Sequence, residues 1–322
     1  MCQTGVFFGE ALAKYGFGSS HPFGNDRIYA FWSKLQSHDL PSVVIEEPDL
    51  ASEQALLSFH DREYIELVKF ASEHGRIVPL DTGDTPSFKG VFEATLYVVG
   101  STSAALDMVM LGTDRSGKKI DHAFNPIGGL HHARRESAGG FCVFNDIAVA
   151  IIKARKKYGI KRIAYVDIDA HHGDGVFYGF EDDPLLFFAD IHEDGRYLYP
   201  GTGFPLEIGK GDAAGTKMNI PLEPGADDDD FVAAFDRVAR FIDDSKPELI
   251  ILQCGADGLA GDPITHLQYS VKAHSFAVSA LHKLAHKYCK GRIVALGGGG
   301  YNRENIGNAW TEVVKSLASE MA

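Results

Sequence analysis

The feature that most constrains this chain is the alternation of short apolar runs with longer segments of helical periodicity. Strands separated by helices predict an α/β protein with a central, mostly parallel sheet and helices on both faces. Several of the runs are continuous β-branched or aromatic stretches, as expected for strands that are buried on both sides. The predicted strands are Val43–Glu46, Arg162–Ile168, Leu185–Asp190, Leu249–Cys254 and Arg292–Leu296.

Three helices are predicted between these strands. Asn145 can cap a helix that continues to Lys157, and Gly159 lies just past its end. Apolar residues recur at helical spacing over Phe231–Asp243 and, less regularly, over Val271–Tyr288.

Two polar features on these helices have simple structural interpretations. The four acids Asp227–Asp230 precede a helix, where negative charge is favourable, and we do not expect a metal there. His282 and His286 stand four residues apart, but no Glu follows His282 and no third ligand suggests itself, so we expect an exposed helix face.

Length and composition predict one folded domain over residues 1–322. With 23% charged and 45% hydrophobic residues, the chain can bury a large core. It contains no linker rich in Pro, Gly or Ser and no internal repeat. Two long loops, Pro79–Lys89 and Glu193–Gly215, are expected to be functional, because long ordered loops in compact domains usually are.

The net charge of −13 argues against nucleic acid and anionic membranes as partners. It is compatible with a cationic small molecule or a lysine-rich surface, and equally with simple solubility. The most apolar stretch, Ala94–Leu111, is interrupted by small polar residues and Asp107, so no membrane span is expected. The four cysteines are scattered and no export signal is visible, which predicts a cytoplasmic protein with reduced thiols.

Polar clusters follow three predicted strands, where α/β proteins bind their ligands. Asp169 and His171 alternate along one extended segment and therefore face the same side, and Asp262 follows a neighbouring strand. Two carboxylates and one imidazole suit Zn²⁺ or Fe²⁺ and leave coordination positions open for water and substrate. The pattern therefore predicts a catalytic metal site.

A base and an oxyanion donor can be placed beside that site. His131 and His132 lie in a glycine-flanked loop, and Asp167 and Asp174 can orient them as His–carboxylate pairs. Tyr301 follows four glycines and can donate its phenol proton to a developing oxyanion. The glycines are not a dinucleotide motif, since Asn302 and Arg303 stand where a third glycine would fall.

These segments, in this order and spacing, resemble the zinc-dependent histone deacetylase family from His21 through Trp310. The stretches His192–Gly203 and Asp262–Leu267 are most similar to the bacterial acetoin-utilisation-type deacetylases. The resemblance implies an arginase–deacetylase fold and hydrolysis of an acetyl-amide to acetate and a free amine.

The resemblance also implies roles for individual residues. Asp169, His171 and Asp262 would bind zinc. His132 with Asp174 would act as general base and acid, and His131 with Asp167 as an electrostatic pair. Tyr301 would stabilise the oxyanion. The residues implied to contact substrate or product are Gly140, Phe141, Tyr199, Asp84 at the rim and Arg27 near the acetate exit.

A structural K⁺ ion is also implied by the resemblance, with ligands at Asp167, Asp169, His171, Asp190 and Ile191. Two positions depart from the usual family pattern. Tyr199 stands where many members have Phe, which makes the tunnel rim more polar, and Asp190 stands where many have Ser. The two-manganese ureohydrolases of the same fold are disfavoured, because Gly173 and Leu259 occupy positions where the second metal needs carboxylates.

Three functions follow from the resemblance. The first is deacetylation of lysine side chains in proteins or peptides. The second is deacetylation of acetylated polyamines or other small amides, which is disfavoured because Pro263–Tyr269 carries no acidic gatekeeper. The third, a catalytically silent module that binds acyl-lysine, is disfavoured because every matched catalytic position is filled.

Overall fold

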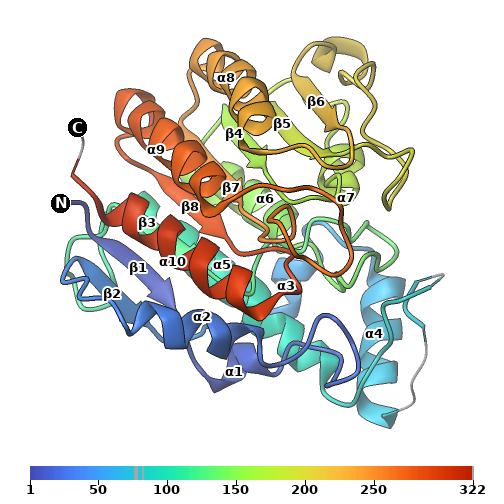
Figure 1. Ribbon diagram of the computed structural model, residues 1–322. Coiled ribbons are helices and arrows are strands. Elements are labelled where there is room, and N and C mark those ends of the chain that lie inside the picture. The colour runs from blue at the N-terminus through green and yellow to red at the C-terminus, as the bar shows by residue number, and fades with distance from the viewer. Residues whose placement is uncertain (76–78, 82, 321–322) are drawn as a thin grey trace.

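The computed structural model describes residues 1–75, 79–81 and 83–320, and its eight strands form one sheet (Figure 1). Their order is β2-β1-β3-β8-β7-β4-β5-β6, and every pairing among them is parallel. The predicted mostly parallel sheet is therefore parallel throughout. The strands are β1 (Thr4–Phe7), β2 (Val43–Glu46), β3 (His122–Asn125), β4 (Ile163–Asp167), β5 (Leu186–Glu193), β6 (Lys217–Leu222), β7 (Leu249–Gln253) and β8 (Ile293–Leu296).

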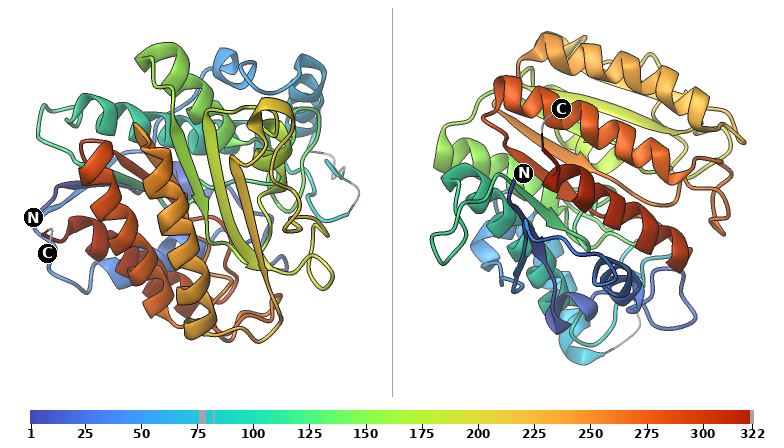
Figure 2. Two further views of the ribbon diagram at one scale, coloured as in Figure 1. Left: turned by 90° about the horizontal axis from the view of Figure 1, so that it is seen from above. Right: turned by 60° about the vertical axis from the view of Figure 1, so that its left-hand side comes forward.

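Helices cover both faces of the sheet and create two apolar cores (Figure 2). Helices α2, α8, α9 and α10 pack together on one face, and α4, α5 and α6 lie on the other. The helices are α1 (Glu10–Ala13), α2 (Arg27–Leu35), α3 (Glu53–Leu56), α4 (Arg62–His74), α5 (Val91–Leu111), α6 (Asp146–Tyr158), α7 (Asp174–Gly179), α8 (Asp228–Ser245), α9 (Val271–Tyr288) and α10 (Arg303–Ala318), with a 3₁₀ turn at Gly211–Ala213.

All five predicted strands are present, with ends shifted by at most three residues. The sequence analysis missed β1, β3 and β6. The first two are four residues long and contain glycine, histidine or asparagine, so they carry little β signal. Strand β6 forms the edge of the sheet and includes Lys217, Asn219 and Pro221, which are typical of edges.

The predicted helices are confirmed, and so are two of their predicted ends. The Asn145 side chain accepts a hydrogen bond from the amide of Ala148, and Gly159 ends α6 in the left-handed conformation. At the start of α8, the Asp227 carboxylate accepts bonds from the amides of Asp229 and Asp230. The acidic run is thus a helix cap.

Helix α5 is the one described helix that is long and apolar enough to cross a membrane. In its most apolar window, 78% of the residues are buried inside the protein. It packs against α6, β3 and α4. This is the environment of a central core helix.

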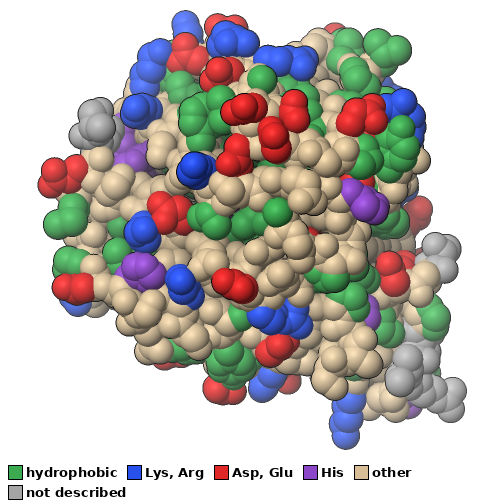
Figure 3. Space-filling view, viewed as in Figure 1, with side chains coloured by type: hydrophobic (Ala, Val, Ile, Leu, Met, Phe, Trp, Pro, Cys, Tyr) green, Lys and Arg blue, Asp and Glu red, His purple; other side chains and the backbone are tan. Residues whose placement is uncertain are grey.

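The charges on the face formed by α8, α9 and α10 are mixed. Figure 3 shows acidic side chains gathered near α8, with basic side chains along the neighbouring edge. The excess of acidic residues is therefore interspersed with lysine and arginine on this side of the molecule.

The expectation for His282 and His286 is wrong. His282 is 3% exposed and His286 is only partly exposed, and both rings face β3 instead of solvent. The spacing of four residues is visible in the sequence. The residues that the two histidines contact belong to distant segments of the chain, and no sequence pattern connects those segments to α9.

Candidate active site

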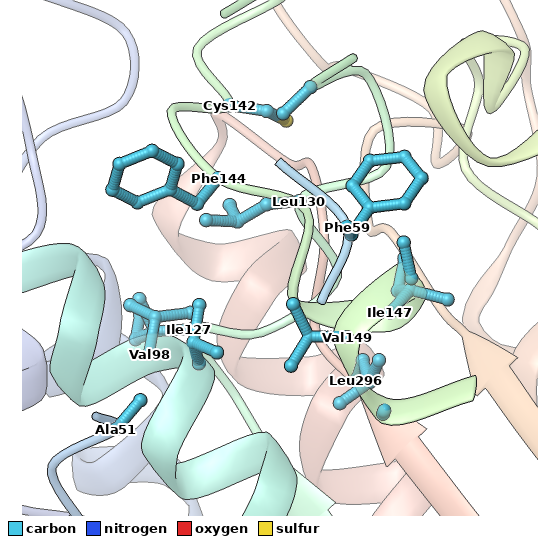
Figure 4. Packing of buried hydrophobic residues seen from close by; sticks show 14 of the residues in the cluster. Ala51, Phe59, Val98, Ile127, Leu130, Cys142, Phe144, Ile147, Val149 and Leu296 are labelled. Atoms are coloured by element: carbon cyan, nitrogen blue, oxygen red, sulfur yellow. The ribbon is translucent and has the colours of Figure 1, made fainter. Parts of the chain in front are cut away.

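The loop after β3 brings the adjacent histidines to the carboxyl end of the sheet. It is anchored by the buried Asp146 carboxylate, which accepts hydrogen bonds from the amides of Gly129 and Leu130. Below the loop, Leu130, Cys142 and Phe144 pack with residues of α5 and α6 (Figure 4). The apolar base and the buried carboxylate together fix the backbone that carries both rings.

Both predicted His–Asp pairs are present. The Nδ1 atom of His131 lies 2.8 Å from Asp167 Oδ2, and the Nδ1 atom of His132 lies 2.7 Å from Asp174 Oδ1. All four side chains are buried. Since each Nδ1 is directed at a carboxylate, each Nε2 points the other way, and both rings line an inner cavity.

The two histidines carry different charges. Burial and the neighbouring charge of His131 lower the pKa of His132 to about 4. Burial also opposes charge on His131, but the carboxylates of Asp167 and Asp169 outweigh it and raise the pKa of His131 to about 9. At neutral pH, His132 is a free base and His131 is an imidazolium.

Arg134 completes the second pair and was not predicted. Its guanidinium donates to Asp174 Oδ2 from Nη2 at 2.7 Å and from Nε at 3.2 Å. Although burial raises the pKa of Asp174, the hydrogen bonds from His132 and Arg134 hold it below its usual value. Asp174 therefore stays ionised and orients His132.

Three side chains at the ends of β4 and β7 form a group with the chemistry of a metal site. Asp169, His171 and Asp257 offer ligand atoms that lie within 4.8 Å of one another. His171 Nδ1 is 3.1 Å from both Asp169 Oδ1 and Asp257 Oδ2. All three side chains are buried.

Asp262, the third metal ligand implied by the resemblance, is not one of these three side chains, and its role as a ligand stays a prediction. Its carboxylate accepts hydrogen bonds from the amides of Tyr301 at 2.8 Å and Ile264 at 3.1 Å, so it fixes the loop that carries Tyr301. Asp257 lies four residues after β7 ends and Asp262 lies nine residues after it, so both belong to the loop that follows this strand. Proximity to the strand end was the signal that could have identified Asp257.

The group fits a divalent cation. Burial and the charge of Asp169 raise the pKa of Asp257 to about 7. Burial opposes charge on His171, yet the same two carboxylates raise its pKa to about 10. Two carboxylates thus compete for one proton in a buried space, and a cation of higher charge would relieve the repulsion.

Glycines shape the backbone around this group. A Cβ atom at Gly255 would lie 2.2 Å from Asp169 Oδ2, and one at Gly299 would lie 2.2 Å from Asp257 Oδ2. Asp169 Oδ2 also accepts hydrogen bonds from Gln253 Nε2 at 2.7 Å and the Gly299 amide at 2.8 Å. Side chains at these glycines would displace the carboxylates. The close packing around the carboxylates therefore explains why the sequence has glycine at these positions.

Tyr301 and Arg27 share the glycine-rich loop after β8. The Arg27 guanidinium donates to the carbonyls of Gly298 and Gly300 and is fully buried, with Phe23 stacked 3.8 Å from it. Partial burial of the Tyr301 phenol raises its pKa, so the hydroxyl keeps its proton. Arg27 thereby holds the backbone that presents Tyr301 to the inner cavity.

A surface cleft of about 620 Å³ leads to His132. Both predicted functional loops reach it: residues 79–84 supply Asp84, and the loop after β5 supplies Tyr199. Thr82 lies outside the described residues. The Tyr199 ring is 47% exposed and 5.1 Å from the His132 ring. The predicted substrate residues Asp84 and Tyr199 therefore line the cleft.

Of the predicted substrate residues, Gly140 lines the inner cavity and Phe141 follows it in the chain. A Cβ atom at Gly140 would lie 2.3 Å from His132 Cδ2. Phe141 has φ of 67°, and its amide and carbonyl are held by Thr85 and Tyr15. Its ring packs 5.7 Å from that of Tyr301.

Three of the residues predicted to bind potassium lie on neighbouring strands, where Asp167 of β4 is paired with Asp190 of β5 and Ile191 follows. The other two, Asp169 and His171, come just after the end of β4. The Asp190 side chain is engaged within the protein. Its carboxylate contacts His192 Nδ1 at 2.6 Å and accepts the Gly173 amide at 2.8 Å. The potassium ligand set stays a prediction.

A parallel α/β sheet with two buried His–Asp pairs beside a metal-type ligand group defines a hydrolytic enzyme. The family model of the histone deacetylase domain, which describes the sequences of that family, matches residues 21–317 of this chain. The chain belongs to the histone deacetylase family, and deacetylation is its general activity.

Individual relatives agree with this assignment. The chain is 41% identical to the acetoin utilization protein AcuC of Bacillus subtilis, over 97% of this chain and 81% of that protein. It is 32% identical to the protein of the same name from Staphylococcus aureus, over 99% and 83%. A crystal structure of an HDAC homolog complexed with SAHA superposes with a TM-score of 0.82 at 30% identity, covering 99% of this chain and 84% of that one. The fold is the arginase–deacetylase fold.

Proposed function

We propose that the protein hydrolyses the acetyl-amide of acetylated lysine side chains in proteins or peptides and releases acetate. The observation that carries this proposal is a buried His132, paired with Asp174, that lines an open cleft close to a ligand group suited to zinc.

The chain's own residues supply the acid–base chemistry. His132 Nε2 takes the proton from the attacking water while Asp174 and Arg134 hold the ring. It then gives that proton to the departing lysine nitrogen. The charged His131 and the protonated hydroxyl of Tyr301 stabilise the negative charge that develops on the carbonyl oxygen.

Asp169 and His171 would hold the metal ion, together with Asp257 of the same buried group or with Asp262 of the predicted ligand set. Bound Zn²⁺, or Fe²⁺ in its place, would polarise the acetyl carbonyl and acidify the water. A K⁺ ion near Asp190 belongs to the same proposal, with a structural role.

The test is hydrolysis of an acetyl-lysine peptide, followed by the release of acetate and free amine together. In a metal-loaded protein, His132→Ala should lower kcat/KM by about 10²–10⁴-fold, because the general base is lost. Tyr301→Phe keeps the ring and should cost about 10²–10³-fold. His38→Ala, on the surface after α2, serves as the matched control and should leave turnover unchanged. Turnover in His132→Ala within a few-fold of the parent would refute the assignment.

A second candidate, deacetylation of acetylated polyamines, is favoured by one observation. Asp81 and Asp84 both line the cleft mouth, where a cationic amine could be held. The test measures kcat/KM for an acetyl-lysine peptide and for acetylputrescine, with the parent protein and with Asp84→Asn. The comparison ranks the two substrates. Binding of the peptide without any turnover in the metal-loaded protein would instead identify a catalytically silent reader.

A further inference from the structure

A second group of metal-ligating side chains lies at the opposite end of the sheet from the active site. Cys2 precedes β1, His122 is the first residue of β3, and His282 and His286 stand one turn apart on α9. The active-site residues follow the carboxyl ends of the strands, whereas these residues gather at the amino ends. We call this group the Cys–His cluster.

The four ligand atoms converge on one point. His122 Nε2 lies 3.1 Å from His282 Nε2, and Cys2 Sγ lies 3.5 Å from Nε2 of both His282 and His286. All four atoms lie within 4.8 Å of one another. Cys2, His122 and His282 are buried, and His286 is partly exposed.

These separations match the edges of a tetrahedral zinc site. Zinc bonds of about 2.0–2.1 Å to nitrogen and about 2.3 Å to sulfur place two nitrogens about 3.3 Å apart, and a nitrogen and a sulfur about 3.6 Å apart. The observed nitrogen–nitrogen contact of 3.1 Å and sulfur–nitrogen contacts of 3.5 Å are close to both values.

Hydrogen bonds alone leave part of the cluster unsatisfied. The Nε2 atom of a neutral imidazole offers either one proton or one lone pair, yet His282 Nε2 contacts both His122 Nε2 and Cys2 Sγ. Likewise, the single thiol proton of Cys2 can serve only one of its two histidines. One cation at the centre would engage all four groups at once.

The surroundings favour a cation. The carboxylate of Asp121 is close enough to act on Cys2, His282 and His286, and it is held by Lys119 at 2.8 Å and by the amide of Gln3 at 2.9 Å.

We propose that the Cys–His cluster is a structural site for Zn²⁺, ligated by one thiolate and three imidazoles. Binding displaces the Cys2 thiol proton to solvent, so one proton leaves for each ion bound. With four protein ligands the site is closed, and its role is to fasten the segment before β1 to β3 and α9. It does not take part in deacetylation.

Cobalt distinguishes this site from the active site. A thiolate bound to Co²⁺ gives a charge-transfer absorption in the near ultraviolet, whereas the active-site group of two carboxylates and one imidazole contains no sulfur. The experiment removes metals from the full-length protein, prepared without an N-terminal tag, and titrates it with Co²⁺. The parent protein should develop the sulfur band and should bind one metal ion more than Cys2→Ser does.

Variants decide the assignment. Cys2→Ser and His286→Ala should lose the band while retaining deacetylase activity, and the partly exposed His286 makes its variant the safer one for folding. Cys289→Ser is the matched control: its buried sulfur contacts the carbonyl of Pro247, outside the cluster, and its band should persist. An absent sulfur band in the parent, or a band unchanged in both cluster variants, would overturn the proposal.

Discussion

At the scale of single residues, two adjacent histidines with similar pairing partners are given opposite charge states by their surroundings. His131 is close to the carboxylates of both Asp167 and Asp169, whereas His132 is close to one carboxylate that Arg134 already neutralises. The cationic neighbour then lowers the pKa of His132 further. Proton transfer and charge stabilisation are thus divided between two rings.

This division predicts a pH effect. An imidazolium at His131 exists below its pKa of about 9 and is lost as pH rises through that value, so kcat/KM should fall on the alkaline side. Asp167→Asn removes the charge that holds the proton, and the alkaline limb should move to lower pH. Asp236→Asn, an exposed acid on α8, should leave the profile unchanged. Identical alkaline limbs for the parent and Asp167→Asn would contradict the charge assigned to His131.

The identity of the third metal ligand, for which the buried group offers Asp257 and the resemblance implies Asp262, leads to a second prediction. Asp257→Ala should abolish binding of the active-site metal, because a ligand and its charge are both lost. Asp262→Asn should retain the ion, since that side chain serves the backbone of the Tyr301 loop. Metal content of the two purified variants, measured after dialysis, checks this. Loss of the metal ion from Asp262→Asn, with retention of the ion in Asp257→Ala, would instead identify Asp262 as the third ligand.

At the scale of elements, the active site depends on loops that begin where parallel strands end and are kept close by glycines. Gly140 illustrates the dependence, because a Cβ atom there would lie 2.3 Å from the His132 ring and its φ is +50°. Both the nearby His132 ring and the positive φ therefore favour glycine at this position.

Gly140→Ala should therefore displace His132. A shift of about 1 Å in a catalytic group costs about 100-fold in rate, and kcat/KM should fall by that order while the fold persists. Gly159→Ala is the control: it has a similar φ of +67° but open space around it, so it should lose about 1 kcal/mol of stability and no activity. Equal activity in the two variants would show that crowding at His132 is unimportant.

The elements also show how far the sequence could predict the structure. Long apolar strands and well-capped helices such as α6 are local signals, and they were found with nearly correct ends. Strands β1 and β3 are too short to give a recognisable strand pattern in the sequence. Their pairing with β8 and with each other, which places His122 near α9, depends on distant parts of the chain.

The same difference between local signals and contacts of distant residues holds for the active site. The His–Asp pairs could be predicted, since motif spacing and strand ends fix them. The choice between Asp257 and Asp262 could not be made from spacing alone, because it depends on how the loop after β7 turns. Arg134 lacked a signal for a similar reason: its partner Asp174 lies forty residues away in the chain.

At the scale of the whole molecule, the parallel sheet separates two kinds of chemistry. Its carboxyl ends carry the acid–base residues and the catalytic ligand group, under loops that form the cleft. Its amino ends carry the Cys–His cluster, near the start of the chain (Figure 1). The net charge of −13 is consistent with a cleft mouth that contains Asp81 and Asp84 and receives lysine-rich or polyamine substrates.

The most direct test of the central claim is acetate release from an acetyl-lysine peptide by metal-free protein, before and after addition of Zn²⁺. We predict no turnover without metal, full recovery on adding Zn²⁺ to the parent, and no recovery in Asp257→Ala. Undiminished turnover by metal-free protein, or no acetate from the metal-loaded parent, would contradict a metal-dependent lysine deacetylase at this site.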